Sequence, residues 1–142
     1  MLEANVQEEI VEQIAGIITY GNGAPVGWTP VTSKGKMCHA NQGQRLAFRF
    51  DGPGDVVQAV MLIGPTRNST PQSPFEQPNP VALTRYSQPD QETNYFMTPP
   101  VNVKKGTWGF SISFMTEVDG TKDSVFYFLP DPELAVGSIG AE

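Results

Sequence analysis

The chain has 142 residues, of which 39% are hydrophobic and 17% are charged, and its formal net charge is −6 at pH 7. This length is typical of one domain, here residues 1–142, and a chain of this size can bury a core without disulfides. Nucleic acids and anionic membranes require a basic surface, and the chain has no large cluster of Lys or Arg. The acidic balance therefore excludes both as expected partners.

Cys38 is the only cysteine, so no disulfide can form within the chain, and this favours a reducing compartment. No apolar run reaches the roughly 18–20 residues of a membrane span. Residues 1–9 are acidic and lack the basic and apolar regions of a secretory signal. We expect a cytoplasmic protein, with a secreted form whose signal has been removed as the alternative.

The N-terminal arm, residues 1–13, has two interpretations. Asn5 and Glu8 fit an N-cap and its capping-box partner, which predicts a short helix or a loose arm over 5–13. The competing interpretation is one strand from Ile10 to Tyr20, because residues 17–20 (I-I-T-Y) favour β structure. We prefer the short helix or loose arm over 5–13, followed by a strand over 14–20. The acidic arm is either a solvated face or a segment that docks on a neighbouring subunit of a homo-oligomer.

Several strands follow in the first half of the chain. Residues 26–32 read as a short edge-type strand, since Pro30 cannot donate to a ladder, and 37–40 as another. The alternation in 45–51 (R-L-A-F-R-F-D) predicts a half-buried strand with a polar outer face. The almost continuously apolar run 56–63 predicts a central strand covered on both faces or passing under a loop.

Residues 64–80 form a long Pro-rich loop in this interpretation. The segment contains five prolines separated by polar residues, which is unsuitable for a strand. Long loops in compact domains are often functional. The segment is therefore our first candidate for a binding surface, the alternative being an insertion without a function.

The second half of the chain continues as strands. Residues 81–86 and 93–98 are short strands, and 124–129 returns after a hairpin turn at Asp119-Gly120. Residues 107–115 (T-W-G-F-S-I-S-F-M) have the clearest period of two, and four side chains are predicted to point inward: Trp108, Phe110, Ile112 and Phe114.

The closing segment 126–137 reads F-Y-F-L-P-D-P-E-L-A-V-G. Its prolines keep the chain extended and remove ladder donors, which suits an edge strand or a switch between sheets, where they would also blunt the edge. Asp131 and Glu133 could form a carboxylate pair, but the polar side of the closing strand is the preferred interpretation.

These elements predict an all-β fold: an immunoglobulin-like antiparallel β-sandwich of about eight or nine strands. A small barrel or a jelly roll is the alternative.

No residue pattern predicts catalysis, a metal site or a cofactor. His39 is the only histidine, and because neighbours on a strand point to opposite faces it should diverge from Cys38. Structural zinc needs more Cys and His ligands than the chain has, and no phosphate-binding Gly-rich motif occurs. Two pairs of carboxylates, Asp51 with Asp55 and Asp119 with Asp123, are weak candidates for a calcium site. Turns also require Asp at such positions for backbone reasons, so both pairs can be explained without a metal.

Three aromatic residues are the candidate ligand-binding residues: Trp28, Tyr86 and Tyr95. They lie on short strands or near loops and could stack on a sugar ring or contact a protein partner. For Trp28, a place in the core between the sheets is the stronger alternative.

The C-terminal third resembles a known family. Gly106 to Phe110 (G-T-W-G-F), the hairpin and aromatic strand after them, and Asp131 to Leu134 (D-P-E-L) are similar to the end of small bacterial immunoglobulin-like proteins of the DP-EP family. The resemblance covers residues 100–137, and Trp108 stands where such sequences more often have Tyr. It implies the sandwich fold, and no catalytic residue, since the family has no assigned enzymatic activity.

We therefore predict a non-catalytic binding or accessory module with an unknown protein or glycan partner, which could form a homo-oligomer. The alternatives are a carbohydrate-binding module, a hydrolase using a carboxylate pair, and a structural or phage-like surface module.

Overall fold

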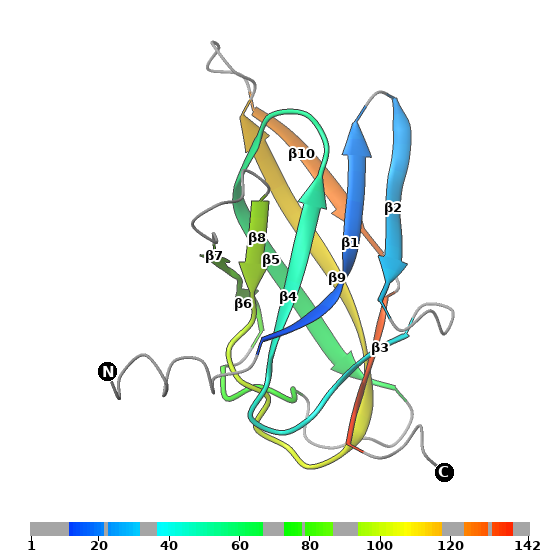
Figure 1. Ribbon diagram of the computed structural model, residues 1–142, viewed down its shortest axis with the longest axis vertical. Helices are drawn as coiled ribbons and strands as arrows, with labels where there is room; N and C mark the ends of the chain where they lie inside the picture. Colours follow the sequence, from blue (N-terminus) through cyan, green and yellow to red (C-terminus); the bar gives the residue numbers. More distant parts are fainter. Residues whose placement is uncertain are drawn as a thin grey trace.

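The computed structural model describes residues 12–21, 23–31, 37–66, 73–77, 79–86, 94–117, 124–130 and 132–137. They form two packed β-sheets, so the predicted all-β sandwich is confirmed (Figure 1). Within these residues there is no helix, and hence none that could cross a membrane.

One sheet has five strands, in the spatial order β2 (Ala24–Pro30), β1 (Glu12–Gly21), β4 (Arg45–Asp51), β8 (Asn94–Met97) and β7 (Thr84–Tyr86). The other has the order β3 (Met37–Ala40), β11 (Glu133–Val136), β9 (Gly106–Glu117), β5 (Asp55–Pro65) and β6 (Val81–Ala82), and β10 (Ser124–Leu129) also pairs with β9. Eleven strands in the described residues exceed the expected eight or nine, mainly because short segments pair separately.

The core lies between the sheets and follows the predicted alternation. On β9 all four predicted inward side chains are buried, as are Leu46, Phe48 and Phe50 on β4. The rings of Phe48 and Phe110 meet edge-to-face with centroids 5.8 Å apart, which joins the two sheets. The period-two pattern of β9 is confirmed. On β4 the three predicted inward side chains are buried, but Ala47, which is predicted on the polar outer face, is buried as well.

The sheets are mixed rather than purely antiparallel, which corrects that part of the prediction. β1 pairs with β4 in parallel, and β11 pairs with β3 in parallel. The reason lies in the path of the chain, which leaves the first sheet after β2, supplies β3 to the second sheet, and returns as β4 beside β1.

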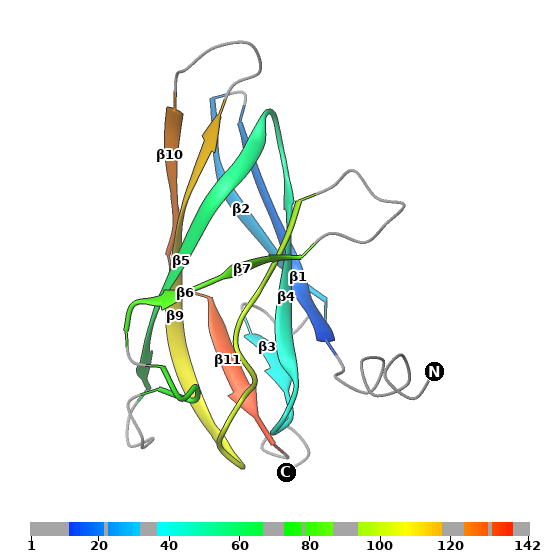
Figure 2. The same cartoon turned by 90° about the vertical axis from the view of Figure 1, so that its left-hand side faces the viewer.

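The predicted strand over 81–86 is divided between the two sheets. Val81 and Ala82 pair with β5, whereas Thr84 to Tyr86 pair with β8. Leu83 marks the crossing: it is buried, and its N–H donates to the carbonyl of Ala59 at 3.0 Å. Figure 2 shows β6 and β7 running from one sheet to the other along the side of the sandwich.

The N-terminal arm falls mostly outside the described residues, which begin at Glu12. β1 starts there, so the last two residues of the predicted 5–13 element belong to a strand. The predicted Pro-rich loop 64–80 is described in part. Its first two residues complete β5, and Phe75 is buried and forms an isolated bridge with Val101.

The prediction that both faces of 56–63 are covered is wrong. Side chains of β5 alternate: Met61 and Ile63 are buried, but Val57 is 38% and Leu62 is 51% exposed. The outward face of this sheet therefore leaves apolar side chains in contact with water. A continuous apolar run can arise from an uncovered face, and composition alone does not distinguish the two cases.

The closing segment is an edge strand followed by an interior strand. β10 and β11 both pair with β9 along different parts of its length, so the segment does not switch sheets. β11 lies between β9 and β3, and Pro132 is buried with its carbonyl accepting the Phe110 N–H at 2.9 Å. The prediction of an edge position is therefore confirmed for β10 and wrong for Pro132. The prolines follow β10 in the chain, so they do not protect its edge from pairing with another strand.

Candidate binding surfaces

Trp28, the first predicted ligand-binding residue, points into the sandwich from β2. Its ring is half-buried and contacts Phe48 at 5.9 Å and Phe110 at 6.1 Å between centroids. An added Cβ on Gly16 would stand 2.6 Å from the edge of this ring, so a residue without a side chain makes room for the indole. These contacts favour the alternative role of Trp28 in the core.

Tyr86 and Tyr95 are brought together by the fold. They are register partners where β7 pairs with β8, at the opposite end of the sheet from Trp28. Tyr95 is only 9% exposed, and the side chain of Tyr86 lies outside the described part of the structure. The three predicted residues therefore do not lie side by side, and neither Trp28 nor Tyr95 presents a fully exposed ring.

The exposed aromatic side chains lie elsewhere, on β10. Phe126 is 76% and Phe128 is 53% exposed, whereas Tyr127 between them packs inward and stacks on Phe114 at 5.1 Å. Sequence analysis did not single out these two phenylalanines. The available signal was the run V-F-Y-F-L, in which neither face of the strand is polar.

The two rings belong to a wider apolar surface across β10, β9 and β5. Phe126 is opposite Met115, Phe128 is opposite Ser113, and Ser113 is opposite Val60 on β5. A shallow groove of about 190 Å³ lies on this face and is lined by Gln58, Val60, Ser113, Phe114, Met115 and Phe126. We call Phe126, Phe128, Met115, Val60 and Leu62 the aromatic patch. It contains no charged side chain.

β10 is also an edge strand with respect to hydrogen bonding. Among the described strands it pairs only with β9, so the backbone groups on its other side have no ladder partner there. It approaches β2 of the other sheet, which likewise pairs only with β1. Protected edges commonly carry Lys, Pro or a bulge, and Ser124–Leu129 contains none of these.

A larger groove opens where the chain crosses from β6 to β7. It has a volume of about 590 Å³ and receives residues from both sheets and from the Pro-rich segment. Gln77, Asn79 and Pro80 of the predicted 64–80 loop line it, together with Arg45 at the start of β4. The part of this loop that the structure describes therefore does contribute to a cavity.

Residues considered for catalysis or metal binding are separated. Cys38 is fully buried while His39 is partly exposed, in line with the expected divergence of the two side chains. Burial raises the pKa of the Cys38 thiol to about 12, which removes nucleophilic thiolate at neutral pH. Among the described residues no three His, Cys, Asp or Glu side chains gather to hold a metal, and neither groove is lined by an acid.

Tyr20 is the most unusual polar group in the core. Its ring contacts Phe114 and Tyr127 at 5.2 and 4.9 Å, and its buried hydroxyl has no hydrogen-bond partner among the described residues. Desolvation, with smaller contributions from Tyr127 and nearby carboxylates, raises its pKa to about 12. Tyr20 lines neither of the two grooves described above, so we assign a structural role to its ring and no role to its hydroxyl.

Comparison of the chain with protein-family models, with curated proteins and with solved structures gave no match. The fold class therefore rests on the sandwich itself, and function has to be argued from the surfaces described above.

Proposed function

We propose that this protein is a non-catalytic binding module that assembles with a second copy of itself through the edge of β10. The observation that carries the proposal is the combination of an edge strand that has no second partner among the described strands with Phe126 and Phe128 exposed on it. Soluble domains rarely leave such a surface open unless it is a site of interaction. An immunoglobulin-like topology and kinship with the DP-EP family are part of the proposal, as is a cytoplasmic location.

Strand addition is the mode of binding that this geometry favours. An extended strand next to β10 would satisfy its free N–H and C=O groups and continue the sheet. Two copies related by a two-fold axis can do this reciprocally, because an antiparallel pair of identical strands is self-complementary. In a register centred on Tyr127, Phe126 of one copy faces Phe128 of the other on the outer face.

Charge favours a second copy at this surface rather than elsewhere. Each chain carries a net charge of −6, so two copies repel when they meet through acidic surfaces. The aromatic patch and β10 contain no charged residue. Contact at β10 keeps the acidic groups apart and joins two neutral apolar strands.

The expected affinity follows from the exposed area. With 76% and 53% of their surfaces exposed, the two rings leave roughly 250 Å² in water per copy on the usual aromatic scale. At about 25 cal/mol per Å², complete covering of both pairs would contribute roughly 12 kcal/mol, against an association cost of about 4–15 kcal/mol. Strand addition leaves the outer face of the sheet open and covers only the flank of each ring, so the contribution is smaller than this upper bound. We therefore expect a weak, reversible dimer that dissociates at micromolar or higher concentrations.

Sedimentation velocity over a concentration series tests the proposal. The weight-average mass should rise from the monomer value of 15.5 kDa towards twice that value. The double variant Phe126→Ser/Phe128→Ser should stay monomeric at every concentration. Val31→Ser removes another 53% exposed apolar side chain, at the turn that follows β2. It is the matched control and should dimerise as the parent does.

The outcomes separate this mode from its alternatives. Leu62 belongs to the patch but lies on β5, away from the edge, so Leu62→Ser should leave an edge-paired dimer intact. Loss of the dimer in Leu62→Ser would indicate face-to-face packing instead. A monomer at all concentrations would overturn self-association, and glycan-array binding that is lost in the double phenylalanine variant would then favour a carbohydrate-binding module.

A further inference from the structure

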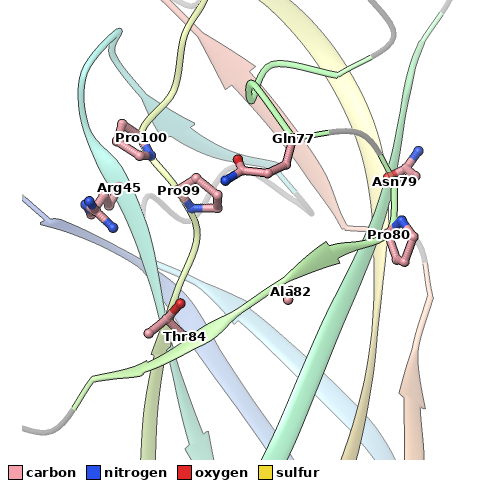
Figure 3. A pocket seen from close by; sticks show the side chains of 8 residues that line it. All are labelled: Arg45, Gln77, Asn79, Pro80, Ala82, Thr84, Pro99 and Pro100. Atoms are coloured by element: carbon pink, nitrogen blue, oxygen red, sulfur yellow. The ribbon is translucent and has the colours of Figure 1, made fainter.

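The groove beside Arg45 is a second surface, independent of β10. Figure 3 shows Arg45 and Pro100 on one side of the groove, Asn79 and Pro80 on the other, and Thr84 at a third position. Gln77 extends between them towards Pro99. Its volume of about 590 Å³ is within the range of small-molecule sites, and Arg45, Gln77 and Thr84 are polar groups set among prolines.

The walls of the groove are fixed by the fold. Asn79 pairs with the backbone of Ile63 like a neighbouring strand, its amide nitrogen donating to the carbonyl at 2.6 Å and its oxygen accepting the N–H at 3.0 Å. Opposite, Pro99 and Pro100 follow β8, and their rings hold the chain in one extended path. The groove is therefore largely preformed.

The polar groups that remain available are mainly hydrogen-bond donors. Asn79 is engaged with Ile63, so a ligand would meet the guanidinium of Arg45, the amide of Gln77 and the hydroxyl of Thr84. No acid lines the groove, and Arg45 is the one cation among its lining residues. Glu12 is the register partner of Arg45 on the neighbouring strand β1 and does not line the groove. A half-buried guanidinium in a groove whose lining contains no acid favours an anionic ligand over a cationic one.

We propose that this groove binds a carboxylate joined to a compact apolar body. A guanidinium holds a carboxylate through two parallel N–H···O bonds, and Gln77 and Thr84 can donate to its remaining lone pairs. One cation matches the single charge of a carboxylate better than the higher charge of a phosphate. Ala82 and the three prolines Pro80, Pro99 and Pro100 supply apolar contacts for the rest of the ligand.

Two-dimensional ¹H–¹⁵N NMR titration with sodium hexanoate tests the site. The backbone amides of Arg45, Gln77 and Thr84 should shift together and saturate. Hexanamide has the same body without the charge and should bind at least about tenfold more weakly, as expected for loss of charged hydrogen bonds. Sodium acetate has the charge without the body and should also bind more weakly. Equal binding of hexanamide would overturn the carboxylate assignment, as would tighter binding of inorganic phosphate.

Substitutions of Arg45 test whether this residue binds the carboxylate. Arg45→Gln should weaken hexanoate binding by about tenfold or more, and Arg45→Lys should be intermediate, since it keeps the charge but loses the planar fork. Arg85→Gln makes the same change in net charge on neighbouring β7 outside the groove, and should bind normally. Equal weakening by Arg85→Gln, or none by Arg45→Gln in a sample with dispersed amide resonances, would refute the site.

The same titration distinguishes two sources of the carboxylate. The tripeptide N-acetyl-Gly-Val-Leu with a free C-terminus is compared with its amidated form. Binding of the free tripeptide more tightly than hexanoate would assign the groove to chain termini, and binding of hexanoate alone would assign it to small organic acids. Absence of binding by both acids would overturn the proposal.

Discussion

Phe126 and Phe114 lie on paired strands, and replacing each with Ala should have very different consequences for stability. Phe114 is buried and contacts the rings of Tyr20, Phe50 and Tyr127. Truncation of such a residue leaves a cavity and costs about 3–5 kcal/mol. That is a large part of the roughly 5–15 kcal/mol by which domains of this kind are stable.

For Phe126 the magnitude follows from its exposure. The ring is 76% exposed, so about a quarter of the roughly 1.5–3 kcal/mol for full burial is at stake, which is about 0.4–0.8 kcal/mol. The lower β propensity of Ala adds up to about 1 kcal/mol. We expect Phe126→Ala to lower the free energy of unfolding by less than about 2 kcal/mol.

Urea unfolding at a concentration low enough to keep the protein monomeric measures both values. Low concentration is essential because a dimer would add its association free energy to the apparent stability. If Phe126→Ala cost as much as Phe114→Ala under these conditions, the Phe126 ring would be packed within the monomer. The proposal that it is available to a second copy would then be refuted.

Further predictions concern the core and the Pro-rich segment. Tyr20→Phe removes a buried hydroxyl without a partner and should raise the free energy of unfolding by about 1–3 kcal/mol at pH 7, measured by urea unfolding. Because the fold raises the pKa of Tyr20 from 10.0 to about 12 and that of Cys38 from 9.0 to about 12, both favour the folded state in their protonated forms. That stability should be complete below pH 9 and decline as pH rises towards 12, and a melting temperature that is constant from pH 8 to pH 11 would contradict it. Asn79→Ala removes both side-chain bonds to Ile63 and should cost about 1–3 kcal/mol in thermal or urea unfolding, whereas the exposed neighbour Gln77→Ala should be neutral.

The strands could be predicted from sequence wherever one face is polar. In residues 107–115 the alternation of Trp108, Phe110, Ile112 and Phe114 with small residues determines which side chains point inward, and the structure agrees. The same holds for Leu46, Phe48 and Phe50 on β4. The alternation is a local property of the chain, so it can be recognised without knowing which strands are neighbours in the sheet.

The candidate surfaces were harder to predict because exposure depends on what the rest of the chain covers. The apolar run of β5 predicts burial on both faces of the strand. Leu62 is nevertheless exposed, because no described segment covers the outer face of this sheet. The sequence places Trp28 among the residues that could stack on a ligand. In the structure its ring instead packs over Gly16, in the space that a side chain there would fill. For Phe126 and Phe128, the local pattern shows an apolar strand but not that its outer edge lacks a partner.

The central claim is that the β10 edge pairs with a second copy, and amide hydrogen exchange of β10 tests it most directly. In the monomer, the amides of Ser124–Leu129 that face away from β9 should exchange rapidly, and they should become protected as protein concentration rises through the dimerisation range. The edge amides of β2 serve as an internal reference and should not change. Protection in β10 that is independent of concentration, or that appears equally in β2, would contradict the account.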